Sequence, residues 1–369
     1  MGTKYQFYSL PLLEIIDETD QAYTLVFPRE DEAFTSFEAG QYLTLKVEID
    51  GEEYRRAYSL CSSPQEPDDV RITIKRVEGG KVSNYLRDRL KVGDRVEVMP
   101  PMGSFLVQPE VSQQLHYVMI GGGSGITPLL SMTKAILSTE YGSRVSLWYG
   151  NRNEESIIFY EALQALQETY GSRLEVVHVL SQPGPDWTGA KGRLTEEKVF
   201  SLLSDLFMEG ELRKRYFLCG PQGLMDAAER ALERQAVHPG HIHREFFSAP
   251  LPDLSALTVS EEGDLSYETE TESFEVSTQK IGLTIRGKRH ELTVEPENSI
   301  LDAAIYARLD PPYTCLAGIC TSCRAMMDTG AVAMDESSGL SQEEIDQGYI
   351  LTCQAHPLSD DVEIIFEED

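Results

Sequence analysis

The sequence contains no apolar run that approaches the roughly 18–20 residues required by a membrane-spanning helix. Its N-terminus, Met1 to Leu10, also lacks the basic segment followed by a long apolar stretch that marks a secretory signal. We therefore expect a cytoplasmic protein that does not interact with a membrane.

Basic residues are scarce. The chain has 32 lysines and arginines against 61 aspartates and glutamates, which gives a formal net charge of −29 at pH 7. A field of that sign repels nucleic acid and anionic membrane surfaces, so neither is expected as a partner. Two explanations stay open: the charge could steer the protein toward a basic partner, or it could serve only solubility.

Cysteine is also sparse, and its six residues are unevenly placed. Cys61 and Cys219 stand alone, whereas the other four crowd into the end of the chain, at Cys315, Cys320, Cys323 and Cys353. A disulfide scaffold is not expected in a long chain without a secretion signal. The crowded four instead indicate a metal or cluster site.

The length of 369 residues exceeds one ordinary core and predicts two or three domains. The first part of the chain holds short segments rich in β-branched and aromatic residues, separated by turn-forming clusters. These segments predict strands at 22–27, 41–47, 54–60 and 70–77, and one helix at 82–90. The pattern is typical of a small antiparallel β-barrel, which we assign to residues 1–112.

From Leu115 the pattern alternates between buried strands and amphipathic helices. Strands are predicted at 115–120, 144–150, 174–180 and 216–219, and helices at 128–137, 156–170, 195–207 and 222–236. Repeated β-α units of this kind form a parallel, doubly wound sheet that binds ligands at the carboxyl ends of its strands. We assign this α/β domain to residues 113–248.

The composition changes again after Ala249. Between Glu261 and Glu275 there are seven carboxylates and no basic residue, which indicates a solvated acidic linker, assigned to residues 249–279. Strands are then predicted at 282–286 and 290–294, and a helix at 299–307. These elements open a C-terminal domain of residues 280–369.

The four crowded cysteines have the spacing Cys315-x4-Cys320-x2-Cys323, with 29 further residues before Cys353. Thiolates in a C-x4-C-x2-C…C arrangement are the plant-type ligand set of a [2Fe–2S] cluster. Small neighbours such as Gly318 allow the backbone to approach the sulfurs closely. A structural zinc site is the competing interpretation, but its ligands usually form two balanced pairs, whereas three cysteines here lie on one loop.

A short polar motif, Arg56-Ala57-Tyr58-Ser59, ends a predicted strand of the barrel. An aromatic ring can stack on an isoalloxazine, a hydroxyl can hydrogen-bond its N5, and a guanidinium can hold a phosphate by two contacts. The later segment Lys75–Ser83 (KRVEGGKVS) leads into a helix, and its glycines and serine suit a pyrophosphate. For Tyr58, simple packing in a core is the competing interpretation.

A glycine-rich segment, Gly121–Pro128 (GGGSGITP), follows the first strand of the α/β domain. Glycines let a backbone approach a dinucleotide, and proline is tolerated in a first helical turn. The glycines do not have the G-x-G-x-x-G spacing of an ordinary Rossmann dehydrogenase. A tight strand-to-helix turn without a ligand is the competing interpretation.

Two later positions are candidates for the reaction path. Cys219, Gly220 and Pro221 close a strand whose carboxyl end is a ligand-binding edge, so the thiol could lie beside a nicotinamide ring. Glu245 and Phe247 end the α/β domain and offer a carboxylate and an aromatic ring near a flavin. An inert buried cysteine, a surface glutamate and a core phenylalanine are the competing interpretations.

Two resemblances follow from these motifs. The segments 312–324 (PYTCLAGICTSCR) and 348–355 (GYILTCQA) resemble plant-type ferredoxin domains, which implies an α+β β-grasp fold. RAYS, GGKVS, GGGSGITP, CGP and HREFF occur in the order found in the ferredoxin–NADP reductase superfamily. Reductase first and ferredoxin last resembles oxygenase reductases of the phenylacetyl-CoA epoxidase type, as do YGNR, GPQGLMDAAE and GAVAMDES.

The resemblance implies a role for each matching position. Tyr58 and Ser59 would contact the flavin of FAD, and its phosphates would be bound around Arg56, Lys75, Gly80, Val82 and Ser83. NAD(P)H would be bound by Gly123, Ser124, Gly125, Ile126, Thr127, Pro128, Arg152, Gly220 and Pro221. Ser59, Cys219 and Glu245 would line the hydride path, Phe247 would flank the flavin, and the four crowded cysteines would bind the cluster.

The choice of dinucleotide stays open, with a lean toward NADPH. After Leu180 and Ser181 the plant reductases carry an arginine that pairs with the 2′-phosphate of NADPH, whereas this chain has Gln182. Arg152, Lys191 or Arg193 could substitute for it. FAD rather than FMN is also an expectation from the resemblance.

Together these inferences predict an oxidoreductase that transfers hydride from NAD(P)H to FAD and passes single electrons through a [2Fe–2S] cluster to an oxygenase. The phenylacetyl-CoA epoxidase complex is the preferred acceptor by resemblance. The alternatives are the reductase of another oxygenase, hydroxylase or desaturase, and an electron-transfer subunit of a larger dehydrogenase complex. A zinc-stabilised module fused to a nucleotide-binding domain is a further alternative.

Overall fold

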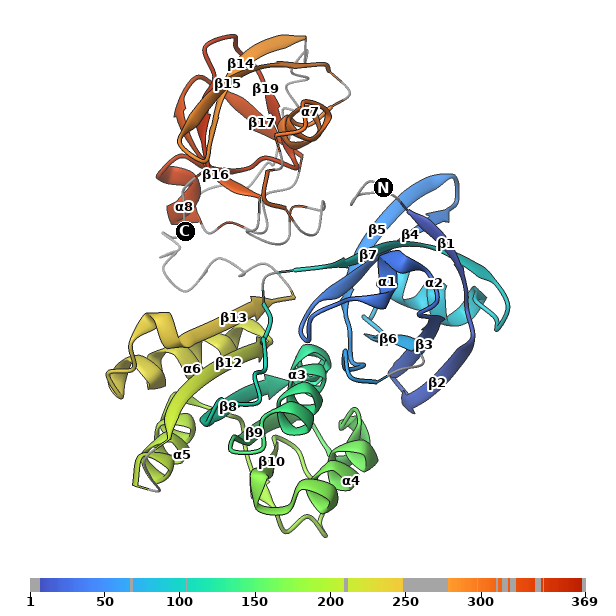
Figure 1. Cartoon of the computed structure of the whole chain (residues 1–369), viewed down its shortest axis with the longest axis vertical. Coiled ribbons are helices and arrows are strands. Elements are labelled where there is room, and N and C mark those ends of the chain that lie inside the picture. Colours follow the sequence, from blue (N-terminus) through green and yellow to red (C-terminus); the bar gives the residue numbers. More distant parts are fainter. Residues whose placement is uncertain are drawn as a thin grey trace, which may run out of the picture. The chain divides into compact units, whose positions relative to one another are not determined.

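The computed structural model divides into two compact units, Met1–Phe247 and Ser248–Asp369, called here the N-terminal and C-terminal units (Figure 1). In the N-terminal unit the structure describes residues 7–66, 69–103, 105–208 and 212–247. In the C-terminal unit it describes residues 278–296, 298–309, 311–313, 318, 323–335, 340 and 342–366. The acidic segment 261–275, predicted to be a linker, lies outside the described residues.

The first half of the N-terminal unit is an antiparallel barrel. Its strands form one sheet in the order β1-β7-β4-β5 and another in the order β2-β3-β6, joined by a bridge between Leu60 and Ile72. Buried leucines, isoleucines, valines and aromatics from both sheets fill one core. The elements are β1 Tyr8–Pro11, β2 Glu14–Thr19, β3 Ala22–Pro28, α1 Glu32–Thr35, β4 Tyr42–Ile49, β5 Glu52–Ser59, β6 Asp69–Lys75, α2 Lys81–Arg89 and β7 Arg95–Met102.

The second half of this unit is a six-stranded parallel sheet in the order β11-β10-β9-β8-β12-β13. Helices α3 and α4 pack on one face, and α5 and α6 pack on the other (Figure 1). The predicted doubly wound fold is therefore confirmed. The elements are β8 Leu115–Gly122, η1 Gly123–Gly125, α3 Ile126–Thr139, β9 Arg144–Asn151, η2 Glu154–Ser156, α4 Tyr160–Tyr170, η3 Gly171–Arg173, β10 Leu174–Leu180, β11 Ala190–Lys191, α5 Glu196–Met208, β12 Arg213–Gly220, α6 Gln222–Arg234, η4 Pro239–His241 and β13 Ile242–Phe246.

The strand order of the parallel sheet reverses beside β8. The chain runs outward from β8 through β9 and β10, and later returns to the other side of β8 as β12. Loops leave in opposite directions at such a point, and the crevice between them is where doubly wound sheets bind ligands. The carboxyl ends of β8 and β12 are thus the expected cofactor edge.

The predicted helix at 156–170 starts too early. Helix α4 begins at Tyr160, because Phe159 has a left-handed backbone with φ of 64° that an α-helix does not accommodate. The preceding residues form the short 3₁₀ turn η2, closed by reciprocal side-chain and backbone contacts between Asn153 and Ser156. The capping box therefore belongs to this short turn, and the α-helix itself begins only after Phe159.

The C-terminal unit has a mixed five-stranded sheet in the order β15-β14-β20-β16-β18, and β17 pairs with β19. Apolar residues of α7 pack on the sheet core, and Ser299 and Asp302 cap that helix reciprocally. The predicted α+β class is confirmed. The elements are β14 Gln279–Ile285, β15 Lys288–Val294, α7 Ile300–Tyr306, β16 Arg324–Thr329, β17 Val332–Met334, α8 Gln342–Asp346, β18 Tyr349–Leu351, β19 Ala355–Pro357 and β20 Glu363–Ile365.

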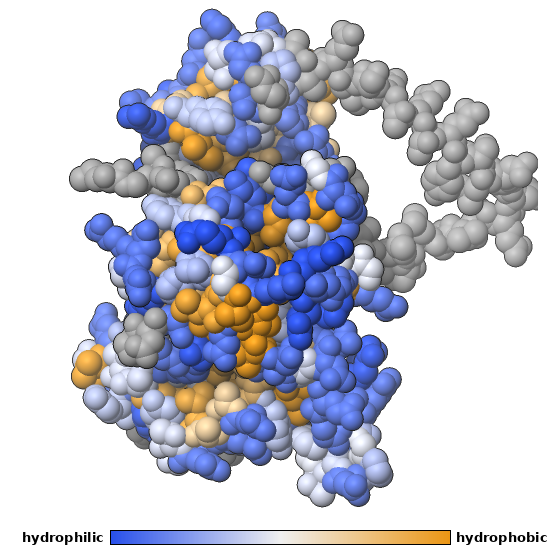
Figure 2. Space-filling view, turned by 90° about the vertical axis from the view of Figure 1, so that its right-hand side faces the viewer, coloured by the Kyte–Doolittle hydropathy of each residue, from blue (hydrophilic) through white to orange (hydrophobic). Residues whose placement is uncertain are grey.

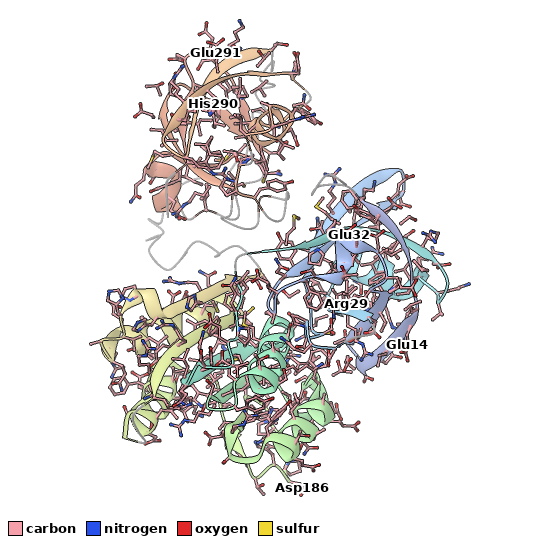
Figure 3. All side chains as sticks on the ribbon, viewed as in Figure 1. Glu14, Arg29, Glu32, Asp186, His290 and Glu291 are labelled. Atoms are coloured by element: carbon pink, nitrogen blue, oxygen red, sulfur yellow. The ribbon has the colours of Figure 1, made fainter. Side chains whose placement is uncertain are left out.

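The surface agrees with the acidic composition. The face shown in Figure 2 is predominantly hydrophilic, with apolar residues exposed between the polar ones. Exposed carboxylates such as Glu14 and Asp186 lie on the periphery of the N-terminal unit (Figure 3). Within the described residues, no helix has the length and apolar character needed to span a bilayer.

Candidate cofactor sites

Three predicted residues lie in one row at the carboxyl edge of the parallel sheet. Cys219 of β12 is in register with Gly121 of β8 on one side and with Glu245 of β13 on the other. The hydroxyl of Ser59, at the end of β5 in the barrel, donates to Oε2 of Glu245 at 3.3 Å. The fold thus brings together a serine and a glutamate that are 186 positions apart.

The surroundings of Glu245 favour its protonated form. Burial raises the pKa of this carboxyl to about 8, and the hydrogen bond from Ser59 acts in the opposite direction without cancelling the rise. Ser59 is itself only 4% exposed. At pH 7 the carboxyl of the partly buried Glu245 is therefore mostly protonated.

Cys219 is fully buried and belongs to the apolar cluster that contains Ile126 and Leu129 of α3. Burial raises the pKa of its thiol well above the usual range, and the charge of Glu245 adds to the rise. The thiol is therefore neutral, and within the N-terminal unit it packs like a small apolar side chain. It does lie at the predicted edge, but its place beside a nicotinamide stays a prediction.

The glycine-rich segment fits closely against β12. A Cβ atom on Gly125 would lie 2.0 Å from the carbonyl oxygen of Cys219, so only glycine is accommodated there. Gly123 has a left-handed φ of 53°, and its carbonyl oxygen accepts a hydrogen bond of 2.9 Å from Tyr149 Oη. Tyr149 was not predicted as a site residue, although it ends a strand in the YGNR segment. These contacts hold the loop backbone in one conformation.

The other residues of the segment contribute mainly through their backbone. Ile126, Thr127 and Pro128 are buried in the first turn of α3, and Thr127 Oγ1 donates to the Ser124 carbonyl at 2.9 Å. Ser124 is only partly buried. Within this segment, Gly123 and Ser124 are therefore the more accessible of the predicted dinucleotide contacts.

Two cations converge on this loop, as an anionic pyrophosphate requires. A Cβ atom on Gly123 would lie 3.3 Å from Nζ of Lys75 at the end of β6. Burial and then the charge of Arg152 lower the pKa of Lys75. The loop, the start of α3 and these side chains together fit a dinucleotide phosphate.

Arg152 also lies next to the position where the sequence lacks an expected arginine. The N–H of Gln182 donates to the carbonyl oxygen of Arg152 at 2.7 Å, so the two residues are neighbours across β9 and β10. The side chain of Arg152 is exposed. It is therefore available to an additional phosphate on the dinucleotide.

The flavin motif lies on β5 of the barrel. Tyr58 is half-buried; burial raises the pKa of its phenol, and the nearby Arg56 guanidinium acts in the opposite direction without reversing this. A neutral ring at the barrel edge suits stacking on an isoalloxazine. These features fit the predicted flavin contacts, although the role of each side chain stays a prediction.

The start of α2 has no side-chain cap. Its N-cap residue Gly80 makes no side-chain capping hydrogen bond, and a Cβ atom there would lie 2.9 Å from Val77 Cβ and 3.0 Å from Ser83 Oγ. Ser83 Oγ accepts from the Val77 N–H at 3.1 Å. Val82 is 4% exposed and packs in the barrel core, so only its backbone can serve a cofactor.

Helix α3 fastens the parallel sheet to the barrel through polar residues that sequence reasoning missed. Ser131 Oγ donates to the carbonyl oxygen of Ser62 at 2.6 Å, and Lys134 Nζ pairs with Glu66 Oε1 at 2.8 Å. Polar residues within an otherwise apolar helix were the available signal. These contacts set the spacing between the flavin and dinucleotide sites.

The remaining predicted residues of the N-terminal unit lie near the same edge. A Cβ atom on Gly220 would lie 3.0 Å from the backbone nitrogen of Gly122, so the two strand ends meet closely. Pro221 is the N-cap of α6. Phe247, the last described residue of the unit, is 37% exposed.

Of the four predicted cluster ligands, the structure describes two. Cys323 and Cys353 are 1% and 8% exposed and share an apolar cluster with Leu301, Leu340 and Leu351. Gln354 Nε2 lies 3.7 Å from Cys353 Sγ, a distance at which an amide donor stabilises a thiolate. Cys315 and Cys320 lie outside the described residues, and the described ones alone contain no group of three metal ligands.

The same loop contains a further feature that suits the cluster. Gly318 is buried and has a left-handed φ of 70°, which a residue with a side chain would rarely adopt. The carbonyl oxygen of Cys323 accepts from both the backbone N–H and Oγ1 of Thr352, at 3.1 and 2.9 Å. Buried thiols on a tethered backbone fit the predicted [2Fe–2S] cluster.

Three known domain families match the chain. The oxidoreductase FAD-binding domain matches residues 12–106, and the oxidoreductase NAD-binding domain matches residues 119–230. The 2Fe–2S iron–sulfur cluster binding domain matches residues 283–358. The order of the three agrees with the order of the motifs.

Relatives match over nearly the whole length. One component of the 1,2-phenylacetyl-CoA epoxidase of Escherichia coli K12 is 36% identical over 98% of this chain and 98% of that protein. The ferredoxin reductase component of a Mycobacterium tuberculosis 3-ketosteroid-9-alpha-monooxygenase is 32% identical over 97% of this chain and 96% of its own. The solved structure of phthalate dioxygenase reductase covers 98% of both chains at 23% identity and a TM-score of 0.58, which supports the fold.

Proposed function

The chain belongs to the family of oxygenase reductases that combine FAD-binding, NAD-binding and [2Fe–2S] domains, and we propose on this basis that its electron acceptor is a phenylacetyl-CoA epoxidase. The protein is an NAD(P)H-dependent oxidoreductase whose cofactors are FAD and a [2Fe–2S] cluster, and whose partner is an oxygenase. The identity of that oxygenase is the part of this assignment that we propose.

The bound groups supply the redox chemistry, since FAD takes two electrons as hydride and the cluster carries one at a time. The residues of this chain bind and orient them. In our proposal the Gly123 loop and Lys75 hold the dinucleotide pyrophosphate, and Tyr58 covers a flavin face. The two rings are then aligned by the contacts between α3 and the barrel, which supply proximity and orientation.

The Ser59–Glu245 pair holds a proton at the edge of this site in our proposal. Because the carboxyl has a pKa of about 8, it is protonated at pH 7 and can donate a hydrogen bond as well as accept one. The pair would thereby orient the carboxamide side of the nicotinamide and exclude water from its neighbourhood. Cys219 contributes by packing closely between Gly121 and Glu245.

We propose Cys315, Cys320, Cys323 and Cys353 as the four thiolate ligands of the cluster. Support comes from their spacing, from the burial of Cys323 and Cys353, and from the match of residues 283–358 to cluster-binding domains. The proposed domains are residues 1–112, 113–248 and 280–369, with the acidic linker at 249–279.

NADPH is the proposed dinucleotide. The supporting observation is the exposed Arg152 beside Gln182, together with Lys75 near the same loop. A guanidinium can bind the 2′-phosphate by two contacts, whereas NADH offers only a hydroxyl there.

The assignment to phenylacetyl-CoA epoxidase is carried by one observation, the match to the Escherichia coli protein across 98% of both chains at 36% identity. The 3-ketosteroid monooxygenase reductase is the second candidate, with 32% identity over a similar length. The difference in identity favours the first.

A coupled assay tests the assignment. The purified holoprotein is mixed with NADPH and either the epoxidase components with phenylacetyl-CoA or the 3-ketosteroid oxygenase with its steroid. We expect substrate-dependent NADPH oxidation to be at least about tenfold faster with the epoxidase, a difference of roughly 1.4 kcal/mol in transition-state stabilisation. Cytochrome c reduction measures intact electron transfer in both mixtures. Equal or faster turnover with the steroid oxygenase would reject the epoxidase assignment without rejecting the reductase.

A further inference from the structure

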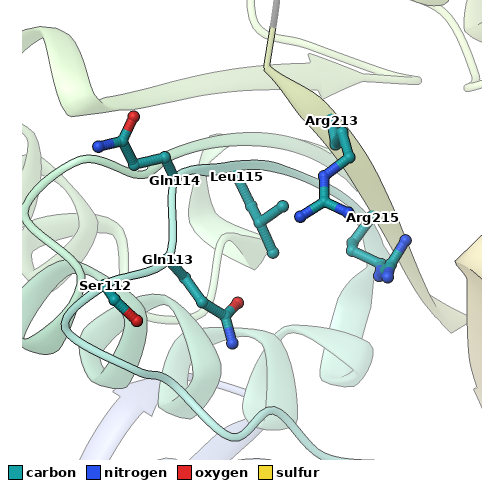
Figure 4. A pocket seen from close by; sticks show the side chains of 6 residues that line it. All are labelled: Ser112, Gln113, Gln114, Leu115, Arg213 and Arg215. Carbon is teal, nitrogen blue, oxygen red and sulfur yellow. The ribbon is translucent and has the colours of Figure 1, made fainter.

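A polar cavity of 480 Å³ lies in the N-terminal unit, away from the cofactor edge (Figure 4). Its wall consists of residues from the segment that joins the barrel to the parallel sheet and from the beginning of β12. They are Ser112, Gln113, Gln114, Leu115, Arg213 and Arg215. None of them is a carboxylate, and only Leu115 is apolar.

The cavity is distinct from the dinucleotide site. Leu115 is the first residue of β8 and is in register with Arg213, the first residue of β12. The cavity therefore lies at the amino ends of these strands, whereas the Gly123 loop and Cys219 lie at their carboxyl ends. A strand of eight residues, as β8 and β12 both are, separates the two edges.

The cavity wall contains two neighbouring arginines of β12. Arg213 and Arg215 are two positions apart on β12, so their side chains leave the same face of the sheet. Several arginines elsewhere pair with carboxylates, as Arg244 does with Glu229 at 2.9 Å, whereas others, such as Arg173, donate to backbone carbonyls. Among the described residues neither Arg213 nor Arg215 makes such a pair, although acidic residues outnumber basic ones by 61 to 32. Within the part of the chain that the structure describes, two like charges therefore lie on one face of β12 without a carboxylate pair.

The charge of Arg215 affects the pKa values of two nearby histidines, His241 and His243. His243 of β13 stacks on Phe217 with ring centroids 4.7 Å apart. Burial lowers its pKa first, and the charges of Arg215 and His241 lower it further. The pKa of His241 is lowered in the same sense by burial and then by Arg215.

The arrangement points to the kind of anion that would fit. A guanidinium presents paired N–H donors in a planar fork, and two adjacent forks need more acceptor oxygens than a single carboxylate has. A phosphate has three terminal oxygens and up to two charges. The volume also exceeds that of an inorganic ion and lies in the usual range of about 300–1,000 Å³ for ligand pockets.

We propose that this cavity binds a small molecule carrying a phosphate group, independently of FAD and the dinucleotide. Arg213 and Arg215 bind the phosphate. Ser112, Gln113 and Gln114 offer hydroxyl and amide groups to the polar remainder of the ligand, and Leu115 offers too little apolar surface for an aliphatic or aromatic ligand.

A buried hydrogen-bond network holds Gln113, which is part of the cavity wall. Tyr117 Oη lies 3.2 Å from Gln113 Oε1 and donates to the buried carboxylate of Glu140 at 2.9 Å. Ser143 Oγ contacts the same carboxylate and also donates to the Gln113 carbonyl. This buried network fixes the backbone of the connecting segment at Gln113, whereas Ser112, Gln114 and Arg213 are exposed.

Calorimetric titration of the oxidised holoprotein tests the proposal. Inorganic pyrophosphate is the probe, NADP⁺ is present at saturation to fill the dinucleotide site, and salt at about 0.15 M screens weak surface attraction. We expect one site per chain. Arg213→Gln and Arg215→Gln should each weaken binding by about tenfold or more, and Arg215→Lys should also weaken it because the ammonium lacks the fork.

Controls separate the cavity from general charge. Arg89→Gln removes the same charge from an exposed position on α2 and should leave the affinity unchanged. Flavin reduction by NADPH should be unaffected in every variant, which shows intact folding. Citrate, a carboxylate anion of similar charge, should bind at least about tenfold more weakly than pyrophosphate.

Three results would overturn the proposal. They are the absence of binding up to about 10 mM pyrophosphate, equal binding by wild type and both glutamine variants, and equal binding of citrate. The last would show a general anionic attraction with no phosphate site. None of these results bears on the proposed oxygenase partner, which the coupled assay tests separately.

Discussion

The proposed sites of the two units consist of different chemical groups. In the N-terminal unit the site consists of glycine backbone, a protonated carboxyl and the cations Lys75 and Arg152, and its cysteines are buried, neutral thiols. Cys61 donates to the Arg71 carbonyl and contacts Thr73 Oγ1 at 3.3 Å, and burial raises its pKa to about 11. In the C-terminal unit the buried thiols of Cys323 and Cys353 are themselves the proposed ligands.

The difference shows that burial alone does not assign a role to a cysteine. Cys61, Cys219, Cys323 and Cys353 are all buried. The first two lie in a packed core. The last two belong to a four-cysteine spacing, and an amide nitrogen lies 3.7 Å from Cys353 Sγ. The neighbours of a thiol decide whether it packs or binds iron.

The largest expected effect comes from replacing a proposed cluster ligand. Cys323→Ser should remove the [2Fe–2S] absorption and lower electron delivery to the oxygenase by at least about 100-fold, because a hydroxyl does not replace the thiolate bond to iron. Reduction of the flavin by NADPH should persist. Absorption spectra and stopped-flow measurements separate the two steps.

The matched control is Cys61→Ser, which changes an equally buried cysteine of the other unit. It should retain the cluster spectrum and oxygenase reduction. Comparable loss of the cluster in both variants would show that the contrast between the units is wrong.

A smaller effect is expected from the glycine loop. The methyl group of Gly125→Ala would meet the Cys219 carbonyl at 2.0 Å, so the loop must shift away from β12. A displacement of that order lowers the rate of flavin reduction by about 100-fold while leaving the cluster intact. Single-turnover reduction by NADPH measures the rate.

Gly223→Ala provides the comparison for that loop. A Cβ atom on Gly223, in the first turn of α6, meets no other atom within 4 Å. This variant should reduce its flavin at the wild-type rate and gain about 0.5–1 kcal/mol of stability. Equal rates for the two alanine variants would mean that the close packing of the loop is unimportant.

The smallest expected effect concerns Glu245 and pH. The pKa of this carboxyl is about 8 in the folded protein and 4.5 in the reference state. Between these values the folded state keeps a proton that the unfolded state has lost, so stability falls as pH rises through this window. The slope for one proton is at most about 1.4 kcal/mol per pH unit. Urea unfolding of the holoprotein at pH 5, 6, 7 and 8 measures it.

Glu245→Gln should flatten that dependence, because an amide holds no titrating proton. Glu229→Gln, which breaks the exposed pair with Arg244, should keep the wild-type slope. An unchanged slope in Glu245→Gln would show that the carboxyl does not stay protonated in the folded protein.

Much of the fold was predictable, and the exceptions have local reasons. The predicted strands at 144–150 and 174–180 match β9 and β10 closely because apolar, β-branched and aromatic residues predominate in both. β2 was missed because none of its residues is fully buried and half of them are acidic. β7 was missed because Pro100 and Pro101 are unfavourable in a strand, and it forms nevertheless between β1 and β4.

The site was predictable only in pieces. The Gly123 loop and the cysteine spacing are encoded within a few neighbouring residues, so the sequence shows them directly. The contact between Ser59 and Glu245 and the link between Ser131 and Ser62 join distant segments, and neither has a local signal. Arg213 and Arg215 of β12 are visible in the sequence only as basic residues of an otherwise acidic chain.

The sequence by itself determined which chemistries were available: four thiols spaced for two irons, and glycines where a backbone must approach a phosphate. Only the tertiary structure decided which groups meet and in what state. The reversal of strand order beside β8 places Gly121, Cys219 and Glu245 in one row, and the barrel adds Ser59. Solvation and neighbouring charges set the pKa of each group, and both depend on residues that are remote in the chain.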